Sequence, residues 1–155
     1  KHPVEAVRTM AEIAEYTEAD IDYAQWFRNT EYVIKDNVDA ISHGTCAMAI
    51  DVHAKGIVVN SVSGVTARMV SRFRCPVDII GTTTSKRVFY KLNLSWGVYP
   101  VLCDEYDSID VMFYQDVIRA KEAIALEPGD NLVLTGGRMT GKSGNTNMIK
   151  IETVC

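Results

Sequence analysis

Hydrophobic and polar residues follow two different periodicities along most of the chain. Short runs of apolar, β-branched residues, such as GIVVN at 56–60, are typical of buried strands. Stretches with an apolar residue at every third or fourth position, such as 65–73, are typical of amphipathic helices. From residue 56 the two kinds of segment alternate, which predicts strands at 56–60, 77–81, 98–102, 131–135 and 146–154, and helices at 65–73, 85–95 and 108–126.

The first 55 residues contain no strand pattern. Residues 3–17 predict a helix with a proline in its first turn. Its apolar face consists of Val4, Val7, Ala11 and Ala14. Residues 18–36 lack a clean period and predict a linker with short helical or extended pieces. A second helix is predicted at 38–54, with Asn37 or Asp36 as its N-cap.

Alternating strands and helices predict an α/β fold, because right-handed crossovers place successive strands parallel in one sheet. We expect three layers, α/β/α, with a mostly parallel five-stranded sheet. The connection 136–145 is glycine-rich and contains no helix. The last strand, 146–154, is therefore expected at the edge and antiparallel to its neighbour.

The segment 56–74 carries the strongest chemical signal. A strand leads into Ser61-Val62-Ser63-Gly64, and a helical pattern begins near Thr66. A strand, a hydroxyl and glycine loop and a helix N-terminus together form a pocket suited to an anion, since the N–H groups of the first turn are free and the helix dipole favours negative charge. The same residues are also explained if Ser63 or Thr66 only caps the helix.

Residues 136–143, GGRMTGKS, fit the nucleotide-binding pattern G-x-x-x-x-G-K-[ST]. That pattern needs a helix directly after the lysine, so that N–H groups face the phosphates. Here an alternating strand follows instead, and we reject a nucleotide P-loop. Two interpretations stay open, a glycine loop that touches a ligand from the side and a plain hairpin connection. Arg138 and Lys142 would bring positive charge to the first of these.

Lys86 and Arg87 follow the hydroxyl-rich residues 82–85, which are expected to form a loop. They would either form a second anion site at the start of a helix or lie on a capped, solvated first turn. The capped turn is the commoner arrangement.

Composition limits the class of protein. The chain has 155 residues, 47% hydrophobic and 23% charged, which is enough for one domain with a real core. A net charge of −4 and a pI near 5.3 argue against a nucleic-acid surface. There is no signal-peptide pattern and no apolar run of about 20 residues, so we expect no membrane partner. Four widely spaced cysteines predict mostly buried, reduced thiols in the cytoplasm, and three scattered histidines predict no metal site.

Several stretches, taken in order, resemble the C-terminal domain of pyruvate kinase. The first is P-V-E-A-V with Met10, and residues 40–54 fit the first long helix of that domain. S-G-V-T-A-R at 63–68 with S-R-F-R at 71–74, and W-G-V-Y-P at 96–100, fit two further family motifs. P-G-D at 128–130, T-G at 135–136 and S-G-N-T-N at 143–147 complete the series.

The resemblance implies a division of the chain. Residues 1–18 correspond to the last helix of a catalytic barrel, 19–36 to a linker, and 37–155 to the C-terminal α/β domain. The family transfers phosphate from phosphoenolpyruvate to ADP in glycolysis, using Mg²⁺ and K⁺. Its catalytic and metal-binding residues belong to the barrel, so this stretch alone is expected to hold no cofactor and not to catalyse.

In the family this domain contains an allosteric site and one subunit interface of a homotetramer. The implied partners are a phosphorylated effector, either a sugar phosphate or AMP, the catalytic barrel, and further copies of the chain. The implied effector-binding residues are Ser61, Val62, Ser63, Gly64, Val65, Thr66, Arg138, Lys142, Ser143 and Gly144.

The chain also departs from the family pattern. Val62 and Val65 stand where some relatives have polar or basic residues, and only Arg119 and Lys121 are loose candidates to hold the far end of a sugar bisphosphate. The effector therefore stays open among a sugar bisphosphate, a sugar monophosphate, AMP or none. A purely structural oligomerisation module is the alternative function.

Overall fold

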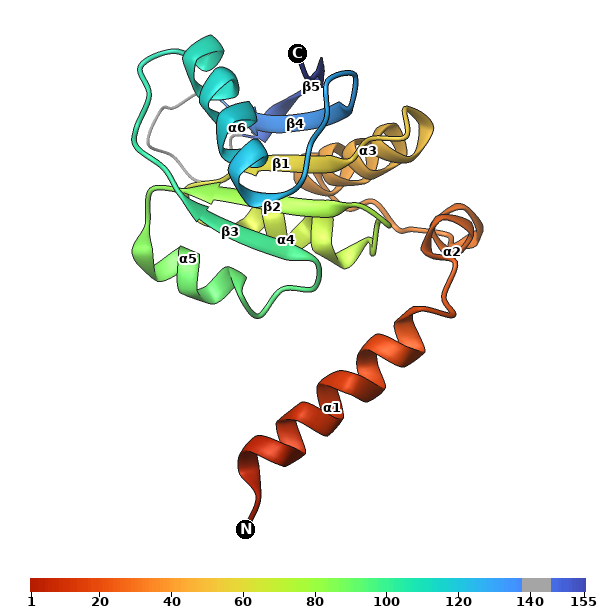
Figure 1. Ribbon diagram of the computed structural model, residues 1–155. Helices are drawn as coiled ribbons and strands as arrows, with labels where there is room; N and C mark the ends of the chain where they lie inside the picture. The colour runs from red at the N-terminus through yellow and green to blue at the C-terminus, as the bar shows by residue number, and fades with distance from the viewer. Residues whose placement is uncertain (138–145) are drawn as a thin grey trace.

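The computed structural model describes residues 1–137 and 146–155. Five strands form one sheet in the order β3-β2-β1-β4-β5 (Figure 1). The strands are β1 (Gly56–Asn60), β2 (Asp78–Thr83), β3 (Val98–Leu102), β4 (Asn131–Gly137) and β5 (Thr146–Thr153). All neighbours are parallel except β4 and β5, which are antiparallel as predicted.

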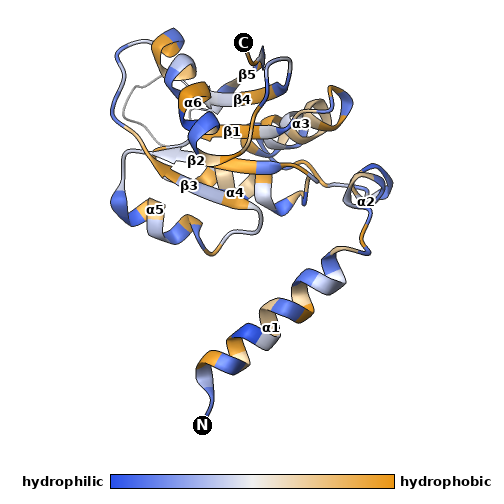
Figure 2. Ribbon diagram, in the orientation of Figure 1, coloured by the Kyte–Doolittle hydropathy of each residue, from blue (hydrophilic) through white to orange (hydrophobic). Residues whose placement is uncertain are grey.

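Helices cover both faces of this sheet, which confirms the three-layer prediction. One face is covered by α3 (Asn37–Asp51), α4 (Val65–Arg72) and α5 (Lys86–Leu92), and the other by α6 (Ile109–Ala123) (Figure 1). Successive residues of a strand point to opposite faces. Accordingly Ile57 and Val59 of β1 enter the core under α3 and α4, while Val58 enters the core under α6. Both cores are built on strands that are apolar along most of their length (Figure 2).

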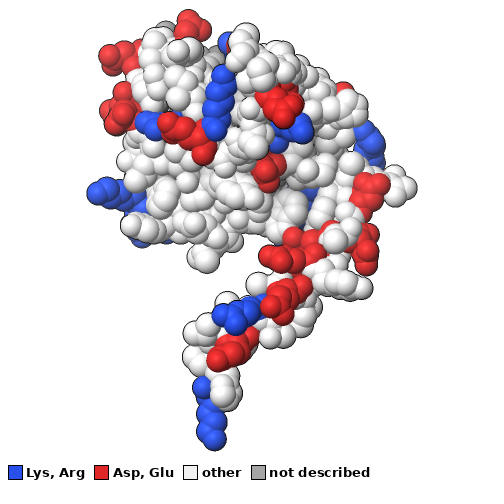
Figure 3. Space-filling model, in the orientation of Figure 1, with Lys and Arg blue, Asp and Glu red and all other residues white. Residues whose placement is uncertain are grey.

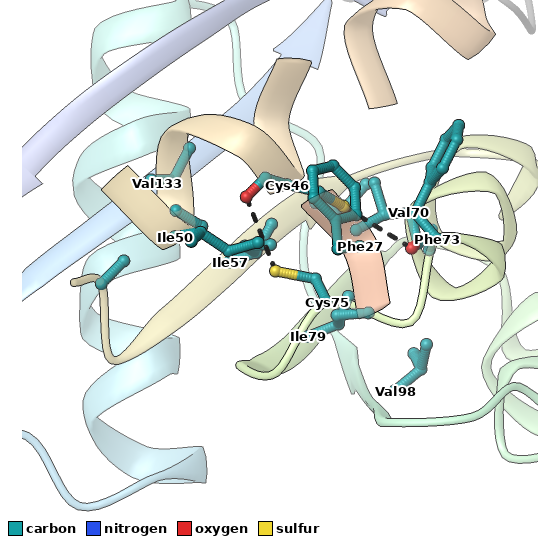
Figure 4. Close-up of a cluster of buried hydrophobic side chains, with 14 of the residues drawn as sticks. Phe27, Cys46, Ile50, Ile57, Val70, Phe73, Cys75, Ile79, Val98 and Val133 are labelled. Carbon is teal, nitrogen blue, oxygen red and sulfur yellow. Dashed lines mark hydrogen bonds between the residues drawn. The ribbon is translucent and has the colours of Figure 1, made fainter. Parts of the chain in front are cut away.

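The larger core contains two of the four cysteines (Figure 4). The Cys75 thiol donates to the carbonyl of Cys46 at 3.7 Å, and the Cys46 thiol donates to the carbonyl of Val70 at 3.8 Å. All four cysteines are free thiols, as predicted, although only these two are buried. Cys103 is half-buried and Cys155 is exposed, so the expectation of mostly buried thiols holds for half of them.

Two helices precede the sheet. The first, α1 (Pro3–Glu18), has no buried residue and extends away from the rest of the molecule (Figure 1). The second, α2 (Tyr23–Asn29), lies inside the predicted linker and buries Phe27 in the larger core. Trp96 connects this region to the sheet, because its indole N–H donates to Glu18 at 2.7 Å and its ring lies 4.9 Å from that of Tyr23.

Several predicted boundaries shift at the ends of elements. Asp36, one of the two predicted N-caps, accepts a hydrogen bond from the N–H of Asp39 and begins α3. The helix ends at Asp51 rather than at 54, because the chain turns at His53 with a positive φ of 52°. Helices α5 and α6 also end three residues early, at Leu92 and Ala123. The spacing of apolar residues does not determine where the hydrogen bonds at the end of a helix stop, so it predicts the last residues of a helix poorly.

Two predicted loops are partly strand. Thr82 and Thr83 belong to β2, where they are buried, and not to a loop at 82–85. Gly136 and Gly137 belong to β4, with a register irregularity between them, so the glycine-rich connection begins later than predicted. Polar and small residues were interpreted as loop, but buried strands near a sheet's end tolerate both when their hydroxyls find partners.

Candidate functional site

The candidate loop lies at the carboxyl end of β1 and leads directly into α4. The N–H of Ser61 donates to the carbonyl of Thr82 at 3.0 Å, which continues the pairing of β1 with β2 by one residue. The hydroxyl of Thr83 donates to the carbonyl of Val62 at 3.3 Å. Strand β2 therefore holds the first half of the loop in place. This is the end of a parallel sheet at which ligands of α/β domains usually bind.

Gly64 is the N-cap of α4, and it has no side chain with which to cap this helix. The N-cap residue is therefore Gly64, and not Ser63 or Thr66 as one interpretation of the sequence had it. Gly64 adopts the left-handed conformation with φ of 73°, and its N–H donates to the carbonyl of Ser61 at 3.4 Å. Within the described part of the chain, no backbone carbonyl accepts from the N–H groups of Val65 or Thr66. These are the donors that a helix start offers to an anion.

Burial divides the loop into covered and accessible residues. Ser61, Gly64 and Thr66 are buried, Ser63 and Val65 are half-buried, and only Val62, at 46%, is well exposed. The hydroxyls of Thr66 and Thr146 lie 2.7 Å apart. This contact joins the start of α4 to the start of β5, so the loop after β1 and the beginning of the last strand are neighbours in space.

The remaining implied effector residues are Arg138, Lys142, Ser143 and Gly144, and they lie outside the described residues. The two loose candidates on α6 have partners of their own. Arg119 pairs with Glu122 at 3.0 Å, and the ammonium of Lys121 donates to the carbonyl of Cys155 at 3.1 Å. Of the predicted residues, the structure therefore brings together the six of the 61–66 loop.

Asp116 is a buried carboxylate that the sequence analysis did not identify. It lies on α6, only 1% exposed, and its Oδ1 accepts a hydrogen bond from the Thr82 hydroxyl at 3.0 Å. Burial raises its pKa to about 6, and hydrogen bonds from Thr82 and Asn60 only partly oppose this rise. Its Oδ2 has no hydrogen-bond partner among the described residues. A lone Asp in a helical pattern is normally solvated, so no local signal pointed to this site.

The start of α5 is capped, as the commoner interpretation of Lys86 and Arg87 predicted. The hydroxyl of Ser85 accepts from the N–H of Val88 at 3.4 Å, and both basic side chains are exposed. Across the described ranges, no group of three or more His, Cys, Asp or Glu side chains could hold one metal ion. The helices that the structure describes include none with the length and apolar character to cross a bilayer.

These features define a class, a three-layer α/β domain whose first strand leads into a helix start with a glycine N-cap. The family model described as "Pyruvate kinase, alpha/beta domain" matches residues 39–152. The chain belongs to this family of pyruvate kinase C-terminal domains. This confirms the resemblance drawn from the sequence motifs.

Full-length relatives agree with the family match. The chain is 40% identical over 154 residues to a pyruvate kinase of Clostridium acetobutylicum, covering 99% of this chain and 33% of that protein. It is 36% identical over 154 residues to a pyruvate kinase of Staphylococcus aureus strain USA300, covering 99% of this chain and 26% of that protein. The chain thus spans a third or less of the length of these relatives.

Proposed function

We propose that this chain is the regulatory and subunit-assembly domain of a pyruvate kinase, and that it binds a phosphorylated metabolite at residues 61–66. The observation that carries the proposal is the helix start of α4, whose N-cap is a glycine in the left-handed conformation at the carboxyl end of β1. A helix N-terminus with a glycine N-cap at the carboxyl end of a parallel strand leaves N–H donors for an oxyanion and adds the favourable end of the helix dipole. The family membership supplies the class of ligand.

In this arrangement the loop binds the phosphate through backbone and hydroxyl groups. The N–H groups of Val65 and Thr66 and the hydroxyls of Ser61 and Ser63 are the proposed donors. Arg138 and Lys142 are proposed to neutralise the charge, since charge-assisted hydrogen bonds are roughly twice as strong as neutral ones. The effector is a sugar phosphate or AMP.

The parent reaction is the transfer of phosphate from phosphoenolpyruvate to ADP, with Mg²⁺ and K⁺ as the metal ions. In this proposal both ions are held by the catalytic barrel of the parent enzyme, as the family resemblance implies. The role of this chain is then to bind, orient and assemble. The apolar face of α1, which includes Val4, Val7 and Met10, is proposed to pack against that barrel.

Assembly is supported by the two free edges of the sheet, β3 and β5. An unpaired edge strand offers a row of N–H and C=O groups to another chain. Strand β5 is the longer edge, and its Ile151 side chain is 43% exposed. These observations also favour the alternative function, a structural module that assembles subunits without binding an effector.

Calorimetric titration tests the effector. Fructose 1,6-bisphosphate, ribose 5-phosphate, glucose 6-phosphate and AMP are titrated into the 155-residue chain, and one of them is expected to bind. Ser63→Asp should abolish this binding, since it places a negative charge beside the phosphate. Ser95→Asp, a half-buried serine that follows α5, is the matched control and should bind normally. No binding by any of the four compounds would leave only the structural module.

Sedimentation tests the assembly. The chain is expected to form dimers that Ile151→Lys dissociates, because the lysine would lie unpaired in the edge-to-edge contact. Val33→Lys, at an exposed position in the segment before α3, is the control and should leave the dimer intact. A chain that stays monomeric at all concentrations would contradict an interface formed by this domain alone.

A further inference from the structure

A pocket of about 290 Å³ lies between the first turn of α4 and one face of α5. Its floor is apolar, formed by Val88 and Leu92, and three basic side chains, Arg68, Arg87 and Lys91, line its wall. The half-buried end of the loop, residues 63–64, forms one rim. Binding pockets for drug-sized ligands begin near 300 Å³, so this volume suits a small ligand.

The three basic side chains converge from two helices. Arg87 and Lys91 lie four residues apart on α5, which places them on the same face one turn apart. Arg68 reaches the pocket from α4. Like charges at this spacing on a helix repel each other by a few tenths of a kcal/mol. An anion bound between the helices would attract both side chains and so offset their mutual repulsion.

The segment that contains α4 and α5 has few acidic residues, although the acidic loop from Asp104 follows it directly. Residues 55–103 contain Lys55, Arg68, Arg72, Arg74, Lys86, Arg87 and Lys91, but Asp78 is their single acidic residue. Asp78 lies at the start of β2. The pocket lies near the opposite end of β2, next to residues 63–64, so Asp78 is not among its lining residues. The whole chain has a net charge of −4, so the positive charge of this segment is opposite in sign to that of the chain as a whole.

The basic residues outside the pocket include two that have partners. Arg72 pairs with Asp39 at 3.1 Å, and Arg74 lies over the ring of Trp96 at 4.7 Å. In the portion that the structure describes, none of the three pocket residues forms an ion pair. On the face shown in Figure 3, basic side chains lie at the edge formed by α5, and others lie over α1 and α6 beside acidic ones. Among the described residues, no ion pair therefore offsets the charge of the three basic side chains of the pocket.

We propose that the pocket between α4 and α5 binds a small polyanion of the phosphate class through Arg68, Arg87 and Lys91. Two guanidinium groups can each bind an oxyanion with two parallel N–H donors, and the lysine adds a point charge. The apolar floor of Val88 and Leu92 accommodates the non-polar part of an organic phosphate.

This site is distinct from the proposed effector loop, although the two share a rim. On the β5 side of the loop, Thr66 contacts Thr146. On the α5 side, Gly64 approaches Val88 so closely that a Cβ would lie 2.7 Å from the Val88 side chain. The pocket opens on the α5 side, and its charges come from side chains of α4 and α5. The effector loop, by contrast, is proposed to use its own backbone and hydroxyl donors together with Arg138 and Lys142. The inference does not depend on the proposed function.

The test uses inorganic pyrophosphate and the 155-residue chain in calorimetry at about 20 mM salt, where surface charges are little screened. Pyrophosphate should bind, and Arg87→Gln combined with Lys91→Gln should weaken binding about tenfold, as expected for losing two partly solvated charged hydrogen bonds. Arg68→Gln alone should weaken it to a smaller extent. Lys86→Gln, on the same helix but outside the pocket, is the matched control and should change binding less than twofold.

A second pair of substitutions separates this pocket from the effector loop. Arg138→Gln combined with Lys142→Gln should leave pyrophosphate binding intact. If these changes abolish binding while the Arg87 and Lys91 variant retains it, the ion occupies the loop and the pocket proposal is overturned, although the proposed function survives. Unchanged binding in the Arg87 and Lys91 variant, or an equal loss in Lys86→Gln, also overturns it. Circular dichroism verifies that each variant is folded.

Discussion

Gly64 meets two separate requirements at the start of α4. Its φ of 73° lies in the left-handed region, which costs an L-residue about 1–2 kcal/mol. Its Cα also faces α5, where an added Cβ would lie 2.7 Å from Cγ1 of Val88 and 3.3 Å from Cδ2 of Leu92. The glycine therefore allows both the turn out of β1 and the close approach of the two helices.

Substitution of this glycine should reveal both requirements. Gly64→Ala is expected to lower the free energy of unfolding by about 2–4 kcal/mol, from the left-handed conformation together with overpacking against Val88. Gly97→Ala is the matched control, since its φ is 66° and nothing lies within 4 Å of its added Cβ. It should cost only about 1–2 kcal/mol in urea denaturation. Equal losses at both positions would show that the contact with α5 adds nothing.

Asp116 links stability to pH. The pKa of this buried carboxyl is raised from 3.8 to about 6, chiefly by burial. Between these two values the unfolded chain carries the ionised form and the folded chain the protonated one. Unfolding then releases a proton, so the contribution of this group to stability is full below pH 3.8 and is lost as the pH rises through about 6.

Asp116→Asn should remove this dependence. The amide keeps an oxygen that accepts from Thr82 and has no charge to desolvate, so the variant should be more stable than the parent by about 3 kcal/mol at pH 7.5. At pH 4 the difference should shrink toward zero. Urea denaturation between pH 4 and 8 measures the stability difference at each pH. Asp110→Asn, at the exposed start of α6, is the control. A constant difference between variant and parent at every pH would contradict the assignment.

At the residue scale, the sequence predicts positions better than contacts. The loop 61–66 could be located because a strand pattern, hydroxyls, a glycine and a helix pattern follow one another within a few residues. The contact between Thr66 and Thr146 could not, since it joins residues 80 apart in the sequence. The burial of Asp116 depends on how α6 packs over β1 and β2, which no local pattern describes.

At the scale of elements, the sequence predicts both ends of two strands correctly. The bounds of β1 and β3 agree with the prediction, because a glycine lies at or just before the start of each strand and Ser61 follows the end of β1. Strand β2 was predicted one residue early and two residues short, since Thr82 and Thr83 have polar side chains that find partners only in the folded sheet. The position of α2 is likewise a tertiary effect, set by the packing of Phe27.

Phe27 should hold α2 against the sheet. Its ring lies 5.0 Å from that of His43, 5.3 Å from Tyr32 and 6.4 Å from Phe73. Phe27→Ala is expected to cost about 3 kcal/mol, the usual effect of removing a buried aromatic ring. Hydrogen exchange should show that the amides of α2 lose their protection while those of β1 keep theirs.

The neighbouring Trp26 provides the control for this experiment. It lies on the same helix and is 43% exposed, so Trp26→Ala should cost less than about 1 kcal/mol. Equal destabilisation by the two substitutions would mean that α2 is held by its general apolar character and not by the ring of Phe27.

At the scale of the whole molecule, apolar burial is uneven. The sheet and its helices enclose two cores, whereas α1 buries no residue and exposes Val4, Val7, Met10 and Ile13. A row of exposed apolar side chains on one helix marks a contact surface. It also means that α1 contributes little to the stability of the sheet domain.

Removal of residues 1–17 tests this separation. The truncated chain keeps Glu18 and its hydrogen bond with Trp96, so its free energy of unfolding should stay within about 0.5 kcal/mol of the full chain. Its tendency to aggregate should fall, because the exposed apolar face is gone. Removal of residues 1–29 is the comparison, and it should cost several kcal/mol through loss of Phe27. A loss of more than about 2 kcal/mol from the shorter truncation would mean that α1 packs against the sheet domain in solution.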